Sequence, residues 1–210
     1  MLQLIRPFLH KTLQSISPCI LCGIDRQQHH SLCKDCWQQL PWSKSTVQRQ
    51  EMDIQVACHY DYPIDRIIQK FKYEQQLHFQ NLLAGALLEL RPPKIQAIVP
   101  MPISNERLVE RGYNQSLVLA KIMAKALNIP IWQPITRLQQ HSQKGLSRLE
   151  RLEDIEQQFQ INTTSKLRYR RVLILDDVVT TGSSIHALKQ KLEELGCQKI
   201  YAACVASAEI

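Results

Sequence analysis

The sequence predicts an α/β fold built on a parallel, doubly wound sheet, with a small cysteine-containing module at its N-terminal end. Short apolar segments alternate along the chain with segments of helical periodicity, which is typical of a parallel sheet with connecting helices. Residues 172–175 (Val-Leu-Ile-Leu) show no polar alternation, as expected of a central strand with both faces covered. Two close cysteine pairs lie before residue 40, in a region without clear periodicity, and indicate a separate module.

The first half of the chain is expected to add one strand and two helices to the sheet domain. Residues 53–62 alternate in polarity like a strand, and apolar residues at helical spacing follow over residues 63–74. A second helix is expected over residues 78–91, where two prolines stop it. Residues 1–16 are expected to form a short amphipathic helix, whereas residues 18–42 have no clear period.

The second half continues the alternation of strands and helices. Its first strand meets a turn bracketed by prolines, and its last helix carries one apolar stripe and stops at Gly196. One charged segment is expected to be a helix or a helical turn. The expected strands are residues 95–102, 171–177 and 199–206, the expected helices are residues 114–128 and 183–196, and the charged segment is residues 146–159.

The composition is ordinary for a soluble globular protein, with 44% apolar and 21% charged residues. No apolar run approaches the length of a membrane span, and the N-terminal residues do not resemble a signal peptide, so we expect a cytoplasmic protein without membrane insertion. The formal net charge is +7, and residues 1–50 hold six Lys or Arg against two Asp. A basic excess admits nucleic acid or phosphate-rich ligands as partners but does not require them.

The stretch "VLILDDVVTTGSS", residues 172–184, carries the strongest functional signal. In an open parallel sheet, ligands lie at the carboxyl ends of the strands. The hydroxyl groups after the strand, a glycine that lets the backbone approach closely, and the start of the next helix together form a cradle suited to a phosphate. The alternative is a loop that caps the helix through Ser183 and leaves the two aspartates solvated.

The two adjacent acids indicate what else this ligand contains. Carboxylates beside a phosphate would repel it, so we expect them to accept hydrogen bonds from ribose hydroxyl groups or to contact a ligand-borne magnesium ion. The whole pattern matches the PRPP-binding signature of type I phosphoribosyltransferases, and we expect the ligand to be phosphoribosyl pyrophosphate (PRPP) or ribose 5-phosphate. The expected contact residues are Asp176, Asp177, Val178, Val179, Thr180, Thr181, Gly182, Ser183 and Ser184.

The cysteine pairs predict a structural zinc site. Cys19 and Cys22 form one CxxC pair, and Cys33 and Cys36 form the other, which is the spacing of a zinc ribbon or knuckle. Four thiolates already fill a tetrahedral site, so the histidines between the pairs are expected to be bystanders. An odd total of seven cysteines fits a reducing cytoplasm better than a disulfide framework. We therefore expect an N-terminal helix and zinc-ribbon module over residues 1–50 and a main domain over residues 51–210.

Basic residues elsewhere suggest two further sites. Arg107 and Arg111 are four positions apart, so both can bind a pyrophosphate from one helical face; the alternative is a solvated face paired with neighbouring glutamates. Lys144 is a third candidate for the pyrophosphate. The run at residues 166–171 places an aromatic ring between cations, a pairing that suits single-stranded DNA, although a solvated approach to the next strand explains it equally well. The candidate DNA contacts are Lys166, Arg168, Tyr169, Arg170 and Arg171.

Taken together, these motifs resemble the ComF family of natural-competence proteins over nearly the whole chain. The resemblance rests on the CxxC pairs, "FKY" at residues 71–73, "RGYNQS" within residues 99–120, "LSRLER" after Gln143, and the PRPP signature. It implies a type I phosphoribosyltransferase domain behind a zinc-binding segment, and a role in DNA uptake and transformation. Asp154 and Gln157 depart from the family pattern and put the loop geometry there in doubt.

Three functions stay open on this basis. The first is a phosphoribosyltransferase acting on an unidentified acceptor, with no residue assigned a catalytic role. The second is a DNA-uptake factor with a functional PRPP site, whose zinc module binds single-stranded DNA or a partner helicase or ATPase. The third is a regulatory protein that senses PRPP without turning it over. The sequence favours the second.

Overall fold

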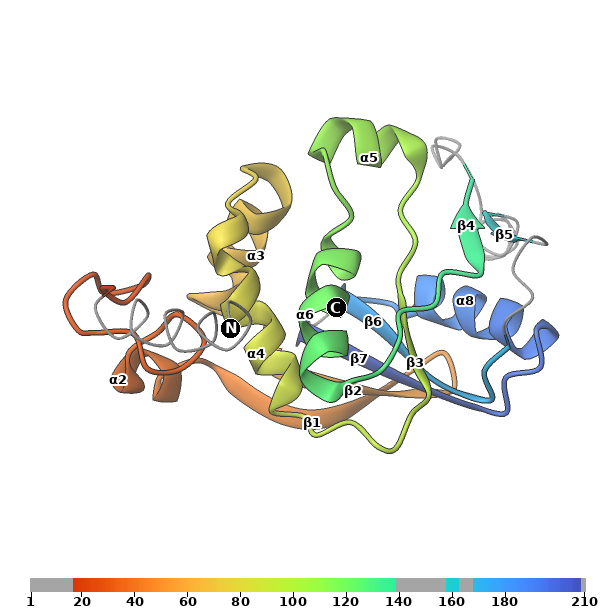
Figure 1. Ribbon diagram of the computed structural model, residues 1–210, viewed down its shortest axis with the longest axis horizontal. Helices are drawn as coiled ribbons and strands as arrows, with labels where there is room; N and C mark the ends of the chain where they lie inside the picture. The colour runs from red at the N-terminus through yellow and green to blue at the C-terminus, as the bar shows by residue number, and fades with distance from the viewer. Residues whose placement is uncertain (1–16, 139–157, 163–167, 209–210) are drawn as a thin grey trace, which may run out of the picture.

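The computed structural model describes residues 17–138, 158–162 and 168–208, and its central feature is a five-stranded sheet (Figure 1). The strands are ordered β1-β2-β7-β6-β3 across the sheet. The last four of these are parallel to one another, and β1 pairs with β2 in the antiparallel direction at one edge. The strand bounds are Trp42–Arg49 for β1, Met52–His59 for β2, Ala97–Pro100 for β3, Arg171–Val179 for β6 and Lys199–Ser207 for β7.

Strand β6 is buried on both faces, as its apolar run predicts. Leu173 and Leu175 belong to one hydrophobic core, and Val172 and Ile174 belong to the core on the other side of the sheet. All four side chains are fully buried. Burying each of them stabilises the fold by about 1.5–3 kcal/mol, so this strand anchors the residues that follow it.

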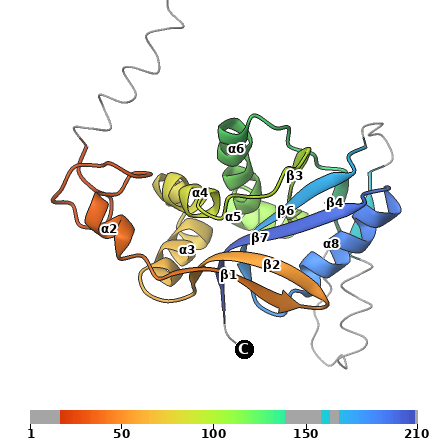
Figure 2. The same cartoon turned by 90° about the horizontal axis from the view of Figure 1, so that it is seen from below.

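Helices cover both faces of the sheet, which confirms the predicted doubly wound fold (Figures 1 and 2). One face packs against three helices, and the other packs against α8 and a small antiparallel sheet of β4 and β5. The bounds are Ile64–Tyr73 for α3, Gln80–Leu88 for α4, Gln115–Leu127 for α6, Ser183–Glu194 for α8, Ile135–Arg137 for β4 and Phe159–Ile161 for β5. A single 3-10 turn, η1 (Leu77–Phe79), precedes α4.

A short helix, α5 (Asn105–Arg111), stands between β3 and α6 (Figure 1). The hydroxyl of Ser104 caps its start, and Gly112 ends it in the left-handed conformation that favours glycine (φ 79°). The side chain of Asn114 then caps α6 by accepting a hydrogen bond from the backbone N–H of Leu117 at 3.0 Å. These caps fix where the first turn of α6 begins, beside the carboxyl end of β6.

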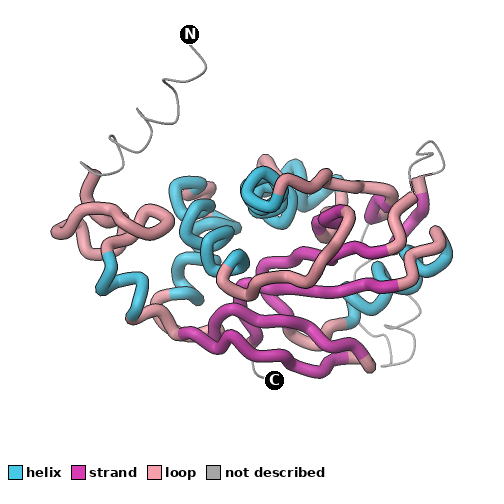
Figure 3. The backbone as a smooth tube through the Cα atoms, turned by 60° about the horizontal axis from the view of Figure 1, so that its bottom comes forward, coloured by secondary structure: helices cyan, strands magenta, loops and turns pink. Residues whose placement is uncertain are grey.

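The cysteine-containing segment packs against the helices on one side of the sheet and leads directly into β1 (Figure 3). Its helix α2 (Lys34–Gln38) begins at Cys33, whose side chain accepts a hydrogen bond from the backbone N–H of Cys36. The imidazole of His30 lies against Gly85 of α4, where a Cβ atom would overlap the ring. Because the segment runs straight into β1, which pairs with β2 in the main sheet, it is connected to the sheet by the chain as well as by side-chain packing.

Most of the predicted elements correspond to observed ones within a few residues, and the differences have physical reasons. β1, β4 and β5 were not predicted: β1 is a largely polar edge strand, and the other two are three residues each. The division into an N-terminal module and a main domain at residue 50 stays a prediction. β1 lies before this boundary, but it pairs with β2, which lies after it. The expected helix at residues 1–16 and most of the charged segment at residues 146–159 lie outside the described residues. No helix among the described residues is long and apolar enough to cross a membrane.

Candidate functional site

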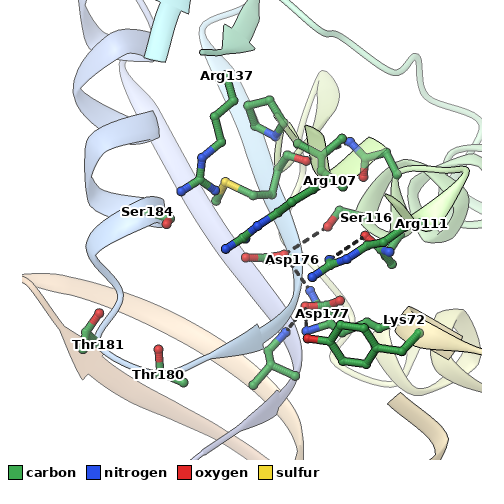
Figure 4. A pocket seen from close by; sticks show the side chains of 17 residues that line it. Lys72, Arg107, Arg111, Ser116, Arg137, Asp176, Asp177, Thr180, Thr181 and Ser184 are labelled. Atoms are coloured by element: carbon green, nitrogen blue, oxygen red, sulfur yellow. Dashed lines mark hydrogen bonds and ion pairs between the residues drawn. The ribbon is translucent and has the colours of Figure 1, made fainter. Parts of the chain in front are cut away.

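A polar pocket of about 450 Å³ lies where the carboxyl ends of β3 and β6 meet the first turn of α6 (Figure 4). The end of α3, helix α5 and strand β4 complete its walls. Segments that are distant in sequence therefore supply its charged side chains, and the strand ends position them as expected for an open parallel sheet.

The two adjacent acids of β6 have different partners in this pocket. Asp176 accepts hydrogen bonds from the hydroxyl of Ser116 at 3.0 Å and from the backbone N–H of Asp177 at 2.9 Å. Asp177 forms an ion pair with Lys72 of α3, with 2.8 Å between Nζ and Oδ1. The Asp177 side chain is 8% exposed and that of Lys72 is 18% exposed, so this ion pair is largely shielded from solvent.

Asp176 and Asp177 differ in their electrostatic surroundings, and this gives them different roles. Burial and the charge of Asp177 raise the pKa of Asp176 to about 6, although Lys72 and the Ser116 hydroxyl oppose the shift. Burial alone would lower the pKa of Lys72, but the charge of Asp177 and its hydrogen bond raise it. Lys72 therefore stays protonated and neutralises Asp177, which leaves Asp176 as the acid available to a ligand.

A smaller cavity of about 70 Å³ lies within the loop that joins β6 to α8. It is lined by residues 178–185 together with Asp176. Gly182 is the N-cap of α8 and has a φ of 78°. The backbone N–H of Ser183 donates a hydrogen bond to the hydroxyl of Thr181 at 3.4 Å, whereas no described side chain caps the N–H groups of Ser184 and Ile185. The hydroxyl groups of Thr181 and Ser183 lie 3.1 Å apart beside it. Free amides, hydroxyl groups and the positive end of a helix together form a phosphate cradle.

The turn between β1 and β2 supports this phosphate loop. Arg49 donates a hydrogen bond from Nε to the carbonyl oxygen of Thr180 at 3.1 Å. A Cβ atom on Gly182 would approach the Cβ of Arg49 to 2.6 Å, so the absence of a side chain there allows the two segments to meet. His186 of α8 also contacts the carbonyl oxygen of Gln50 through Nδ1 at 3.0 Å.

Three arginines project into the main pocket, two from α5 and one from β4 (Figure 4). Arg111 donates a hydrogen bond to Oε1 of Gln115 at 3.3 Å, and its guanidinium lies 5.1 Å from the centre of the Tyr73 ring. Arg137 donates to Oε1 of Gln158 at 3.0 Å. Arg107 and Arg111 thus both line the pocket, whereas the alternative expected a purely solvated helical face.

The structure brings most of the sequence-predicted ligand residues together. Six of them line the main pocket, namely Asp176, Asp177, Val178, Thr180, Thr181 and Ser184; Val179, Gly182 and Ser183 line the smaller cavity. Lys144 lies outside the described residues. Reasoning from the sequence missed the roles of Lys72, Ser116 and Arg137. The first two lie in the "FKY" and "RGYNQS" runs, which had suggested the family but no role, and Arg137 had no signal at all.

The four predicted zinc ligands also converge. The sulfur atoms of Cys19, Cys22, Cys33 and Cys36 all lie within 4.8 Å of one another, a grouping that could hold a metal ion. Burial would raise the pKa of Cys19, but backbone N–H groups of Cys22, Cys33 and Leu21 outweigh it and lower that pKa to about 7. His29 and His30 do not belong to this group; both rings lie near Trp37.

The candidate DNA-binding run lies at the opposite end of the strands from the pocket. Arg170 and Arg171 line a cavity of about 320 Å³ together with Lys199, at the amino ends of β6 and β7. Arg168 is exposed, whereas Tyr169 is half-buried and packs edge-on against Trp132 with 5.3 Å between ring centres. Lys166 lies outside the described residues.

Comparison with known proteins places these features in a family. The family model "Phosphoribosyl transferase domain" matches residues 113–209. Competence protein F of Haemophilus influenzae is 31% identical, over 90% of this chain and 84% of that protein. Competence protein ComFC of Bacillus subtilis is 27% identical, over 85% of this chain and 72% of that protein. DNA utilization protein YhgH of Escherichia coli K12 is 26% identical, over 89% of this chain and 82% of that protein.

Among solved structures, a crystal structure of adenine phosphoribosyltransferase matches 66% of this chain and 74% of its own, with 18% identity and a TM-score of 0.40. The similarity to Competence protein F extends well beyond the phosphoribosyltransferase domain into the N-terminal part of the chain. This protein therefore belongs to the ComF family of competence proteins.

Proposed function

We propose that the pocket at the end of β6 binds PRPP and that the protein uses this site in DNA uptake. The observation that carries the proposal is the combination of a phosphate cradle, an available carboxylate and three arginines around two cavities that share lining residues. The cradle of Thr180–Ser184 would hold the 5′-phosphate, since it offers amides, hydroxyl groups and a helix N-terminus. The arginines would face the pyrophosphate.

The acid pair would hold the ribose. Asp176 is an acceptor when ionised and has no ion-pair partner among the residues that the structure describes, so it suits a ribose hydroxyl group. Oxygen ligands of this kind also fit a magnesium ion carried by PRPP, which would neutralise charge on its diphosphate. Lys72 and Ser116 would keep the two carboxylates in place while the ligand binds.

The cysteine group would hold one structural zinc ion. Zinc–sulfur bonds of about 2.3 Å in a tetrahedron require sulfur atoms about 3.8 Å apart. The sulfur atoms of Cys22 and Cys33 lie 3.9 Å apart, and backbone N–H groups point at two of the four sulfurs. A closed site with four sulfur ligands holds a fold together and leaves no position for catalysis. The four cysteines form no disulfide bonds, which supports a location in the reducing cytoplasm.

A second candidate function is binding of single-stranded DNA at the amino ends of the strands. Arg170, Arg171 and Lys199 gather around one cavity there, and Arg168 lies next to them in sequence. These cations would neutralise phosphate groups, so affinity should fall steeply as the salt concentration rises. Because Tyr169 packs against Trp132, we assign the contact to the cations more than to base stacking. The same surface, or the zinc module, could instead meet a competence helicase or ATPase.

Calorimetry with PRPP and magnesium tests the proposed site. The unaltered protein should bind PRPP, and a Thr181→Val, Ser184→Ala variant should lose most of that affinity, because the cradle then loses two hydroxyl donors. Absence of PRPP binding by the unaltered, folded protein would reject the proposal. A pyrophosphate-release assay with and without single-stranded DNA then separates a transferase from a PRPP-sensing uptake factor.

A further inference from the structure

The turn that joins β1 to β2 has an unusual backbone conformation. Arg49 pairs with Met52, so only Gln50 and Glu51 lie between the two strands. Both have a positive φ, 47° and 57° respectively, which is a left-handed conformation that glycine or asparagine usually supplies in such turns. Residues with a Cβ atom keep this conformation where the surrounding structure holds them, and such positions are frequent at functional sites.

The contacts that hold this turn come from the segment between β6 and α8 (Figure 2). Arg49 donates through Nε to the carbonyl oxygen of Thr180 at 3.1 Å, and its Cβ lies against the backbone of Gly182. Nδ1 of His186 lies 3.0 Å from the carbonyl oxygen of Gln50. A carbonyl oxygen only accepts hydrogen bonds, so Nδ1 carries a proton and donates. The turn is thus fastened on both sides of Gly182.

The turn lies behind the phosphate cradle. Among the described residues that line the two cavities, Arg49, Gln50 and His186 do not occur. In a trans peptide the C=O and N–H groups point in opposite directions, so holding the carbonyl of Thr180 toward the turn directs the N–H of Thr181 away from it. The hydrogen bond of His186 likewise fixes the start of α8. Both contacts therefore orient amides of the cradle without entering it.

This support comes from outside the segment that matches the phosphoribosyltransferase family model. The match spans residues 113–209, whereas the turn is at residues 50–51, in the hairpin that follows the cysteine module. Arg49 and Thr180 are 131 positions apart in the sequence. The N-terminal part of the chain thus supports a loop whose own residues all belong to the C-terminal part.

We infer that His186 is a positioning residue for the sugar-phosphate site and that it acts through the β1–β2 turn. This inference rests on the proposed function, since it assumes that the cradle holds the 5′-phosphate. The hydrogen bond from His186 to Gln50 holds the turn against the start of α8, and Arg49 of the same turn then holds the loop through Thr180. An anion that is bound by several N–H groups gains affinity when these groups already converge before it binds, so loosening the turn costs affinity.

Calorimetry with ribose 5-phosphate on three proteins tests the role of His186. In His186→Asn the amide nitrogen takes about the position of Nδ1 and can still donate to Gln50, whereas in His186→Gln it lies near the position of Nε2 and cannot. We expect His186→Gln to weaken binding by about 3- to 10-fold, the loss expected for one hydrogen bond. His186→Asn should retain the affinity of the unaltered protein within about twofold.

A double variant tests whether the two contacts act through the same turn. If they do, Arg49→Ala combined with His186→Gln should weaken ribose 5-phosphate binding by less than the product of the two single losses, because a turn that is already released has little more to lose. A combined loss equal to that product would show that the two residues act independently, and would overturn the assignment of the turn as their shared element.

Hydrogen exchange of the unaltered protein provides a test that needs no variant. Coupling between two sites is reciprocal, so ribose 5-phosphate in the cradle should slow the exchange of backbone amides at residues 48–53. Unchanged exchange there, equal affinities in all three proteins, or equal losses in His186→Asn and His186→Gln would each overturn the inference while sugar-phosphate binding stands. If the unaltered protein binds neither ribose 5-phosphate nor PRPP, the proposed function itself fails, and the inference fails with it.

Discussion

Two ion pairs in this protein have nearly the same length and differ in burial, which allows the effect of burial to be measured. Lys72 and Asp177 lie 2.8 Å apart with side chains 18% and 8% exposed. Lys44 and Glu89 lie 2.7 Å apart with side chains 44% and 38% exposed. We predict that Lys72→Met lowers the free energy of unfolding far more than Lys44→Met.

The magnitudes follow from the two environments. At an effective dielectric constant of about 20, charges 2.8 Å apart attract by about 6 kcal/mol, and desolvation of both groups offsets much of this. Removing only the lysine leaves a buried carboxylate without a counter-charge, at a cost of about 3–5 kcal/mol. In water the exposed pair attracts by about 1.5 kcal/mol before salt screening and side-chain entropy, and its net contribution is about 0–1 kcal/mol.

Urea unfolding followed by tryptophan fluorescence measures both variants. Adding Asp177→Asn to Lys72→Met should recover most of the stability at neutral pH. The reasoning would be refuted if Lys72→Met and Lys44→Met cost the same small amount.

Three further predictions concern the two binding sites. Because the folded-state pKa of Asp176 is raised to about 6, its carboxyl group favours folding when protonated and loses that contribution as pH rises through about 6. Above that pH both of its oxygens are charged acceptors for ribose hydroxyl groups, whereas the protonated form keeps only a weaker, neutral acceptor. The PRPP affinity lost in Asp176→Asn, measured by calorimetry, should therefore be large at pH 7.5 and small at pH 5. Elemental analysis should find one zinc per chain, and Cys33→Ser should lose it and unfold the cysteine module at a lower temperature than the sheet; a metal-free protein with an unchanged melting curve would contradict this. Arg49→Ala should weaken phosphate binding by about 3- to 10-fold, the loss expected for one hydrogen bond that positions the loop through Thr180, and Arg49→Lys should restore only part of it; equal affinity in all three proteins would show that the loop holds its own shape.

The sequence was most informative where the relevant residues are contiguous. Strand β6, its acids and the following loop form a single local unit, so a burial pattern and helix-terminus chemistry were enough to predict a phosphate cradle there. The four cysteines were recognisable because the spacing of metal ligands is itself local. Lys72 could not be predicted in the same way, because only the packing of α3 against the sheet brings it to Asp177.

Other features depend on tertiary contacts that leave no periodic signal. Arg137 lies in a strand of three residues, and its side chain reaches the pocket only because β4 packs beside β5. β1 was missed because most of its residues are exposed or half-buried, so no apolar alternation marks it as a strand. It forms because the edge of β2 offers unpaired backbone groups, which is a property of the assembled sheet and not of residues 42–49.

The edge position of β1 has a practical consequence for dividing this protein into parts. A chain shortened to start at residue 51 would lose the module and also uncover the backbone of β2, whose side chains include the fully buried Ile54. An unprotected edge of this kind pairs readily with other chains, so such a fragment should self-associate. A cut after Leu40 would keep the polar, lysine-bearing strand that shields the sheet. Any division of this protein should therefore keep β1 with the sheet, and removing the cysteine segment would in addition uncover the helices against which Leu32 packs.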